Sequence, residues 1–485
     1  MKINNISPNS LNTNFKGMDA LSKTLYLLQN NDMLNAAAVD VFAMDTPRTL
    51  VEYKYRGKNA GREMGFREFT GTFIAEFSAA LFAFLTSKIL TKTHKPEIKT
   101  NSSSWATNNS IDVFNKIYES SDKTTVGFVN NVLDSMKGIS GKNEVDFKNI
   151  SKENLVQEIV DLIEKPQDKK QFAKVQDNII RLIKADNNIT IEKDGSVFSS
   201  NLNHALRDMV DLSKNVFFNK EVDTNSALSK LKEINKSKVA FAIPLSMAIA
   251  ITNQYINRKI TKKKTGIDNF VGENGYDKNV KEKNQKDKQK GLWWKKMLSA
   301  GVFLFMLTKV MNLKNPADLV NKLEFTGPAT SGNTIKTVYG TLILGRILAS
   351  KDTTELRETT VRDYLGFLSW LVLGGFVAKG VAQAFDPKQE YLFNITKQGT
   401  GIKHWLNDVQ IKSQKEIMAS GGDIAKNLKK LNIAQLSGIA YSAVMLGVLL
   451  PKLNIWMTRK NKNDDSTYTK VPAFMGMDEY IKNKL

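Results

Sequence analysis

The stretch "ITNQYINRKITKKKTG", residues 251–266, ends an apolar run abruptly in a cluster of Lys and Arg. A second apolar run ends near the C-terminus in "PKLNIWMTRKNKND", residues 451–464. Both segments carry Asn, an aromatic residue, Arg and Lys at the same relative positions. These are Asn253, Tyr255, Arg258 and Lys259 in the first segment, and Asn454, Trp456, Arg459 and Lys460 in the second.

This signature is typical of a helix that leaves a lipid bilayer. Tyr and Trp prefer the headgroup layer, because their rings are apolar while the OH or NH group needs water. Arg and Lys just beyond them stay in water beside anionic lipid, and they favour the cytoplasmic side. We therefore expect Tyr255, Arg258, Lys259, Trp456, Arg459 and Lys460 to be interfacial anchors. Convergence on interface chemistry explains the repeat better than duplication, which stays open.

Six apolar runs punctuate the chain, at residues 69–87, 239–257, 297–313, 337–350, 364–385 and 433–451. The third run follows Trp293 and Trp294, a further pair of interfacial anchors. A helix needs about 20 residues to cross the hydrocarbon core. The fold class we predict is all-α, a polytopic α-helical membrane protein with about six spans. The alternative is that the runs are buried helices of a large soluble protein.

The remaining segments alternate with these runs. Residues 92–238 show helical periodicity and one predicted β-hairpin around Asp194-Gly195, so we expect a soluble, mostly helical insert. The predicted order is a disordered tail (1–17), an amphipathic and basic juxtamembrane region (18–68), helix 1 (69–91), the insert (92–238), helix 2 (239–257), a basic linker (258–296), helices 3–5 (297–385), a polar linker (386–432), helix 6 (433–457) and a basic tail (458–485).

The net charge of +21 is distributed unevenly. Residues 92–238 carry only +2, so +19 belongs to the segments around the apolar runs. Such a distribution suits anionic headgroups, and we expect the lipid bilayer, and possible other membrane proteins, as partners. Nucleic acid is disfavoured, because Arg is scarce (11 Arg against 59 Lys) and no zinc finger or aromatic–basic platform is visible.

The sequence offers no recognisable catalytic motif. There is no Cys, and the three His (His94, His204 and His404) lie far apart, so we predict no metal site and no cofactor. A P-loop, an H-E-x-x-H motif and a G-x-S-x-G motif are all missing. We therefore do not expect an enzyme of a familiar class.

Four charged residues lie within the apolar runs. Lys309 is near the end of the third run, where its long side chain can reach the surface, whereas Glu76, Arg346 and Lys379 interrupt their runs. An unpaired charge inside a bilayer costs about 2.5–3.5 kcal/mol on insertion scales, so each needs a partner or a function. We expect Glu76 to pair with Lys379 or Arg346 on a neighbouring helix, either as a coupling site or as a contact between helices. Arg346 also makes 337–350 the weakest of the six runs.

These features predict an integral membrane protein with a structural or interaction role. The alternatives are a transporter or channel that uses the intramembrane charges, and a large soluble helical protein that binds acidic partners or a membrane surface. The expected location is a membrane, most simply the bacterial cytoplasmic membrane. Residues 1–17 do not resemble a secretory signal peptide, so a later hydrophobic segment would act as the uncleaved signal. Six spans would place both termini in the cytoplasm.

Overall fold

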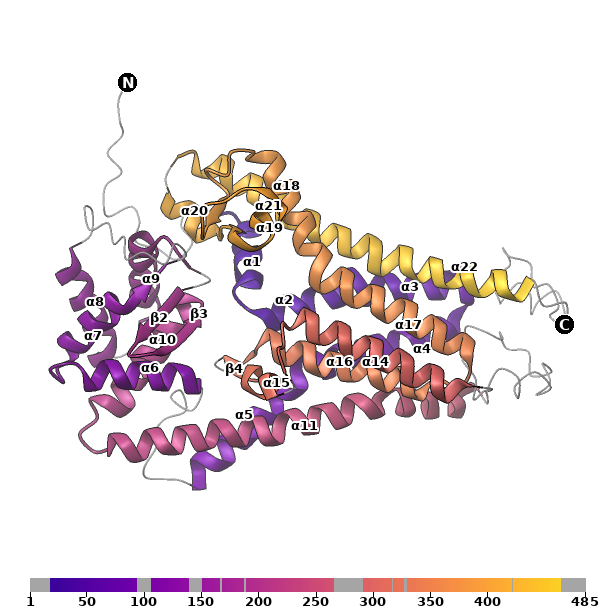
Figure 1. Cartoon of the computed structure of the whole chain (residues 1–485), viewed down its shortest axis with the longest axis horizontal. Coiled ribbons are helices and arrows are strands. Elements are labelled where there is room, and N and C mark those ends of the chain that lie inside the picture. The colour runs from indigo at the N-terminus through magenta and orange to yellow at the C-terminus, as the bar shows by residue number, and fades with distance from the viewer. Residues whose placement is uncertain are drawn as a thin grey trace.

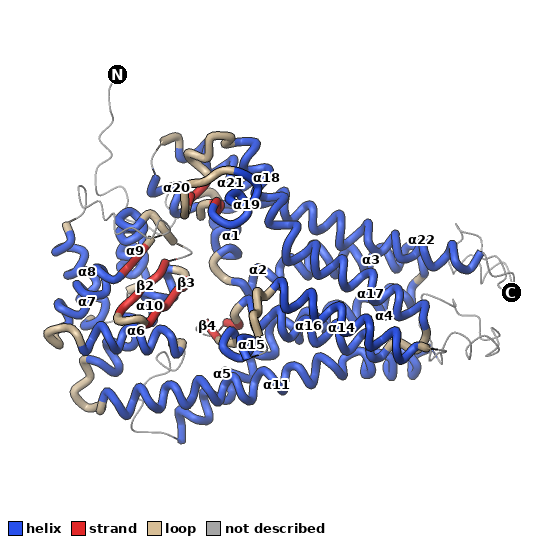
Figure 2. Tube along the Cα trace, viewed as in Figure 1, coloured by secondary structure: helices blue, strands red, loops and turns tan. Residues whose placement is uncertain are grey.

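The computed structural model is mostly helical, with small antiparallel sheets (Figures 1 and 2). It describes residues 18–93, 106–138, 151–165, 168–186, 189–265, 291–315, 317–326, 329–420 and 422–463. The predicted tail 1–17, His94, and most of the basic linker and of the C-terminal tail lie outside the described residues. All six apolar runs are helical, as predicted.

Long helices lie side by side in one bundle, which makes up one half of the molecule (Figure 1). Several contain a π-type segment, labelled η. The bundle elements are α2 (Asp32–Ala38), η2 (Val39–Asp45), α3 (Thr46–Arg56), α4 (Lys58–Thr72), η3 (Phe73–Ser78), α5 (Ala79–Thr93), α11 (Thr224–Thr265), α14 (Leu292–Val310), α16 (Gly332–Ala349), α17 (Thr353–Leu368), η8 (Ser369–Leu373), α18 (Gly374–Phe385), α21 (Ile424–Ser442), η9 (Ala443–Leu449) and α22 (Leu450–Asn463).

Three continuous helices are long and apolar enough to cross a membrane: Lys58–Leu90, Thr224–Lys264 and Ile424–Thr458. The second contains Pro244, in the interior of α11. A proline in a helix interior removes a backbone hydrogen bond, and neighbouring helices can compensate for that loss. The number of spans beyond these three stays a prediction.

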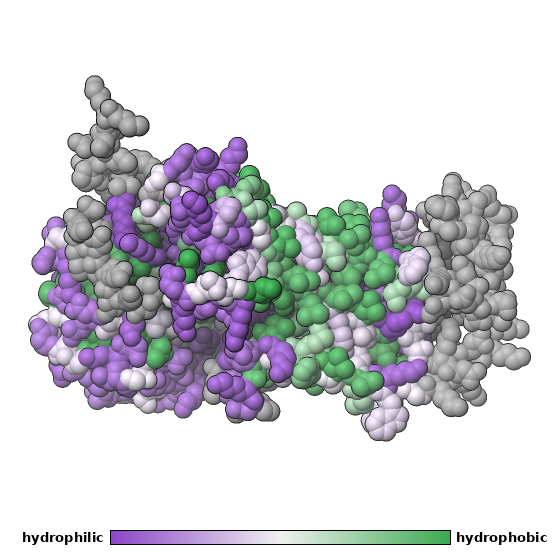
Figure 3. Space-filling view, turned by 45° about the horizontal axis from the view of Figure 1, so that its top comes forward, coloured by the Kyte–Doolittle hydropathy of each residue, from purple (hydrophilic) through white to green (hydrophobic). Residues whose placement is uncertain are grey.

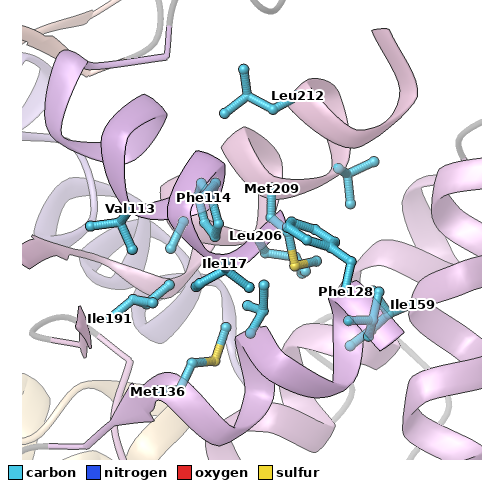
Figure 4. Close-up of a cluster of buried hydrophobic side chains, with 14 of the residues drawn as sticks. Val113, Phe114, Ile117, Phe128, Met136, Ile159, Ile191, Leu206, Met209 and Leu212 are labelled. Carbon is cyan, nitrogen blue, oxygen red and sulfur yellow. The ribbon is translucent and has the colours of Figure 1, made fainter. Parts of the chain in front are cut away.

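The insert forms a separate body with its own core. Its elements are α6 (Asn108–Glu119), α7 (Thr125–Ser135), β1 (Met136–Lys137), α8 (Lys152–Glu164), α9 (Lys169–Ile183), β2 (Ile189–Lys193), β3 (Ser196–Ser200), α10 (Leu202–Leu212) and η6 (Ser213–Phe217). Figure 4 shows Phe114, Phe128 and Met209 packed together at the centre of that core. The apolar residues of α8 that the periodicity placed on one face, among them Leu155 and Ile159, are fully buried.

The predicted hairpin of the insert is confirmed. Strands β2 and β3 pair antiparallel, with Lys193 opposite Ser196, so the turn consists of Asp194 and Gly195. Both turn residues have positive φ, 45° and 76°. Asp and Gly are the residues that tolerate this backbone conformation, which is why the pair specifies a tight hairpin.

Smaller elements complete the chain at the end of the bundle nearest the insert. They are α1 (Ala20–Gln29), α15 (Ala317–Lys322), β4 (Phe325–Thr326), β5 (Ala329–Thr330), β6 (Phe393–Ile395), α19 (Gly401–Asp408), β7 (Val409–Ile411) and α20 (Gln414–Ser420). We call this end the insert end, and the opposite end, where α11 and α22 finish, the signature end (Figure 1).

The two described ends of the chain lie at opposite ends of the bundle, which differs from our expectation. Met18 packs with Leu392 and Phe393 at the insert end, whereas α22 finishes at the signature end. The reason is that α2, η2 and α3 together run along the bundle from the insert end to the signature end, within the interval 18–68 that was expected beside the bilayer. Asp32 accepts a hydrogen bond from Gly332 N at the insert end, and Arg56 reaches Glu358 at the other.

Removing a core ring from the insert should unfold it. Phe114 is fully buried, so Phe114→Ala should lower the free energy of unfolding by about 3–5 kcal/mol. Val197 lies exposed on β3, and Val197→Ala is the matched control, with an expected change within about 0.5 kcal/mol. Chemical denaturation of the whole chain in detergent, followed by circular dichroism, measures both. Equal effects of the two variants would contradict the described core.

Candidate functional site

The outer surface of the bundle is apolar. Large side chains such as Phe42 (76% exposed), Leu50, Phe73 and Phe305 point outward from four different elements. Figure 3 shows hydrophobic surface over the bundle, next to a mainly hydrophilic surface over the insert half. Among residues 106–223 as described, only Val126 and Val197 are large apolar side chains with comparable exposure. The surfaces of the two halves of the molecule therefore differ in polarity.

The interior of the bundle, by contrast, contains charged side chains. Arg is rare in this chain, yet six of its eleven Arg take part in ion pairs between the bundle helices or within them: Arg48, Arg56, Arg67, Arg258, Arg346 and Arg362. Arg suits this role because its planar guanidinium stays charged and makes several directed hydrogen bonds. The candidate functional site is this interior.

Its middle is a group of six side chains that we call the central cluster: Arg48, Arg67, Glu68, Arg346, Arg362 and Asp363. Glu68 Oε2 lies 3.2 Å from a terminal nitrogen of Arg48 and 3.2 Å from one of Arg346. Arg346 also reaches Asp363 at 3.3 Å. Because these residues come from α3, α4, α16 and α17, the cluster joins four helices.

The central cluster contains four Arg and two carboxylates, all buried. Arg362 pairs with its neighbour Asp363 (2.7 Å), and Arg67 with its neighbour Glu68 (3.2 Å). Arg48 also donates to the backbone carbonyl of Leu446 in η9, at 3.4 Å. Two positive charges remain unbalanced within the cluster itself, so nearby carboxylates are needed to neutralise it.

A second set of ion pairs lies at the signature end. Arg56 binds Glu358 on α17 (2.6 Å) and Glu52 on its own helix (3.3 Å). Arg258, in the first signature, pairs with Glu355. In the second signature Asn454 donates to the Glu358 carbonyl (3.2 Å), and the Thr458 hydroxyl donates to the Glu358 carboxylate. Both signatures are therefore fixed to the first turns of α17.

Three further acids lie on the other side of the central cluster, toward the insert end: Asp40, Asp45 and Glu76, which we call the acid group. Each is less than 1% exposed. Asp45 accepts a hydrogen bond from the Thr72 hydroxyl at 2.7 Å. Both carboxyl oxygens of Asp40 and both of Glu76 are buried without a hydrogen-bond partner. Asp40 and Asp45 lie in η2 and Glu76 in η3, and π-type segments are frequent at functional sites.

The pairing predicted for Glu76 is not formed, and we correct it. Arg346 binds Glu68 and Asp363 instead. Lys379 donates to the backbone carbonyl of Trp405 and lies 4.4 Å from the centre of its ring. Lys379 is on α18, which packs on α21 at the insert end, so it is remote from α4 and η3. The pairing was predicted wrongly because the spacing of residues within one apolar run does not indicate which helices are neighbours.

The predicted interfacial anchors lie at the signature end. Tyr255, Trp293, Trp294 and Trp456 are exposed, and Lys259 is exposed as well. Lys296 connects the start of α14 to the Leu348 carbonyl at the end of α16, 2.8 Å away. The side chains of Arg459 and Lys460 lie outside the part of the chain that the structure describes. Arg258 differs from a simple anchor, because it is bound to Glu355.

Sequence reasoning missed most of the central cluster. Arg48, Glu52 and Arg56 recur every four residues, so they share one helix face, and Glu358 and Arg362 do so on α17. That spacing of opposite charges was the available signal. Residues 48, 52 and 56 were instead assigned to the basic juxtamembrane region 18–68, because segments of low hydropathy usually lie in water.

A polar junction connects the insert to the bundle side. Asp186, which follows α9, accepts from the Ser413 hydroxyl (3.2 Å), and its backbone N–H donates to Glu416 (2.7 Å). Lys415 pairs with Asp177 at 2.8 Å. Burial raises the pKa of Asp186, and burial raises the pKa of Glu416 to about 7, with the nearby Asp186 contributing in the same direction.

Comparisons of the chain with protein-family models, with curated proteins and with solved structures find no match. The function must therefore be argued from the geometry alone. Within the described residues, no three His, Asp or Glu side chains converge so as to hold a metal ion.

Removing the shared carboxylate of the central cluster should destabilise the bundle. Glu68→Gln leaves Arg48, Arg67 and Arg346 with less compensating charge, and breaking a buried pair costs about 3–5 kcal/mol. Glu164→Gln changes an exposed acid of the insert and is the matched control. The midpoint of unfolding in a mixed-micelle denaturant titration measures both. A Glu68→Gln midpoint equal to that of the control would show that the cluster does not stabilise the fold.

The junction between α9 and α20 should weaken as the pH rises. A buried carboxyl with a raised pKa favours the folded state while it is protonated, so the contribution of Glu416 is full below its ordinary pKa of 4.5 and is lost as the pH approaches about 7. The free energy of unfolding should be higher at pH 5 than at pH 8 by about 2.5 kcal/mol, which thermal unfolding at the two pH values measures. Glu416→Gln should reduce that difference. An unchanged difference would show that other groups cause the pH dependence.

Proposed function

We propose that the chain is an integral membrane protein whose helical bundle lies in a lipid bilayer and holds the insert in water on one side. Its role would be structural or one of interaction at the membrane. The observation that carries the proposal is the polarity of the bundle: apolar side chains such as Phe42 and Phe305 cover its outside, while its interior holds buried ion pairs beside an apolar core. In water the opposite arrangement is the stable one.

The dimensions of the bundle support the same placement. Helix α14 has 19 residues and therefore a length of about 28 Å, close to the hydrocarbon thickness of about 30 Å. Trp293 and Trp294 stand at its signature end, where aromatic side chains suit the headgroup layer. The longer helices, such as α11 with 42 residues, continue beyond that thickness into the insert.

Charge favours a cytoplasmic signature end. Arg258, Lys259, Lys262, Lys263 and Lys264 lie in the last two turns of α11, and Lys58 is exposed at the start of α4. Short basic segments beside spanning helices stay on the cytoplasmic side and attract anionic lipid. The insert, with its nearly balanced charge, would then lie on the other side. Because α2, η2 and α3 add a crossing, Met18 would lie on the side of the insert, unlike in the six-span prediction.

The test combines extraction with labelling. After alkaline carbonate washing the full chain should stay in the membrane pellet; release into the supernatant would favour the alternative of a soluble helical protein. The natural absence of Cys provides a clean background for single substitutions. Val126→Cys in the insert and Lys58→Cys at the signature end should react with a membrane-impermeant maleimide from opposite sides.

Val302→Cys is the matched third position, because Val302 is exposed in the middle of α14, as Val126 is in the insert. It should resist the same reagent in intact membranes and react only after detergent is added. Rapid labelling of Val302→Cys in intact membranes, or labelling of Val126→Cys and Lys58→Cys from one side, would contradict the proposed placement.

Transport is a second candidate, favoured by one observation. Glu76 and Asp40 are buried carboxyls without hydrogen-bond partners, and ionisable groups of this kind mark ion or proton pathways in membrane proteins. The coupling pair of Glu76 with Lys379 is no longer part of this candidate. Proteoliposomes containing a pH-sensitive dye should then show a proton flux that Glu76→Gln abolishes. Wild-type vesicles no leakier than empty ones would eliminate it.

A further inference from the structure

We propose that Glu76, the third member of the acid group beside Asp40 and Asp45, is a proton-binding site. Its buried carboxyl holds a proton at neutral pH. This inference deepens the transport candidate, which uses the same side chain, but it requires only proton binding and no proton flux. Glu76 lies in η3 with both carboxyl oxygens buried and without a hydrogen-bond partner.

Among the described residues, the charged groups with an electrostatic effect on the Glu76 carboxyl are acidic. They are Asp32 at the start of α2, and Asp40 and Asp45 in η2. The Thr330 hydroxyl of β5 donates to the Glu76 backbone carbonyl at 3.2 Å, and not to the carboxyl. An ionised Glu76 would therefore be a buried charge among like charges, an arrangement that is very costly in a medium of low dielectric constant.

The acids next to Glu76 are in a different position. Arg48 and Arg346 of the central cluster lie within electrostatic reach of both Asp40 and Asp45. The cluster has four Arg and two carboxylates, so two further carboxylates would make it neutral. Asp40 and Asp45 can supply them, with Asp45 also held by Thr72 at 2.7 Å. Glu76 is then the surplus acid, and a bound proton neutralises it.

A metal cation is the less suitable occupant. The described residues contain no group of three His, Asp or Glu arranged to hold a metal ion. Hard cations need several oxygen ligands at short, regular distances. A proton needs only one carboxyl, and Glu76 supplies it. Asp32, which is exposed, marks the direction of water at the insert end.

Infrared difference spectroscopy of the purified full chain tests the proposal directly. A protonated carboxyl has a C=O stretching band that is separate from the carboxylate bands and shifts in D₂O. At pH 7 in choline chloride, the wild-type protein should show such a band. Glu76→Gln should remove most of it, because Gln has the shape of protonated Glu but no carboxyl. Glu164→Gln, the exposed control, should leave it unchanged.

Three outcomes would overturn the proposal: no protonated-carboxyl band in the folded wild-type protein, a band that survives in Glu76→Gln, or a band that disappears when sodium replaces choline. The last would assign the site to a metal cation. Thermal unfolding gives a second readout, since Glu76→Gln should leave the midpoint unchanged or raise it, whereas a required carboxylate would lower it. Both measurements are made in detergent. Their results are therefore independent of carbonate extraction, which tests the membrane placement, and of proton flux, which tests transport.

Discussion

Ion pairs between Arg and carboxylate side chains, shared by several helices in a dry interior, are the interaction on which the bundle depends. Glu68 binds Arg48 from α3 and Arg346 from α16, and Arg346 continues to Asp363 on α17. In a bilayer the hydrophobic effect cannot drive helices together, because lipid tails are as apolar as Leu. Packing and polar contacts between helices then decide which helices are neighbours. The central cluster supplies such contacts for α3, α4, α16 and α17.

The arrangement also explains why helices that carry charged residues belong to the interior. Helix α16 is almost entirely buried, so its Arg346 contacts the carboxylates of Glu68 and Asp363. Helix α3 presents Arg48, Glu52 and Arg56 inward while Leu50 and Tyr53 point outward. The insert is organised in the ordinary way, with an apolar core around Phe114 and a charged surface. The chain thus combines an insert with an apolar core and a charged surface and a bundle with buried ion pairs and an apolar surface.

Sequence patterns predicted the elements more successfully than the contacts between them. Period-3.6 apolar spacing located the insert helices, and Asp194-Gly195 located the hairpin turn, because both signals are local. The apolar runs were correctly predicted as helices, three of them long enough to cross a membrane. The partner of Glu76 was predicted wrongly, since pairing depends on which helices are neighbours. The charged segment 18–68 was predicted to lie beside the bilayer, because an average hydropathy does not show whether charges neutralise one another.

The central claim is that lipid surrounds the bundle, and spin labels provide its most direct test. A label at Phe305 or Phe42, both exposed on the bundle, and one at Val126 in the insert can be compared for collisions with oxygen and with a water-soluble nickel complex. Oxygen concentrates in the bilayer interior, whereas the nickel complex stays in water. In vesicles, the two bundle labels should collide mainly with oxygen and the insert label mainly with nickel. Preferential collision with nickel at all three positions would contradict the claim.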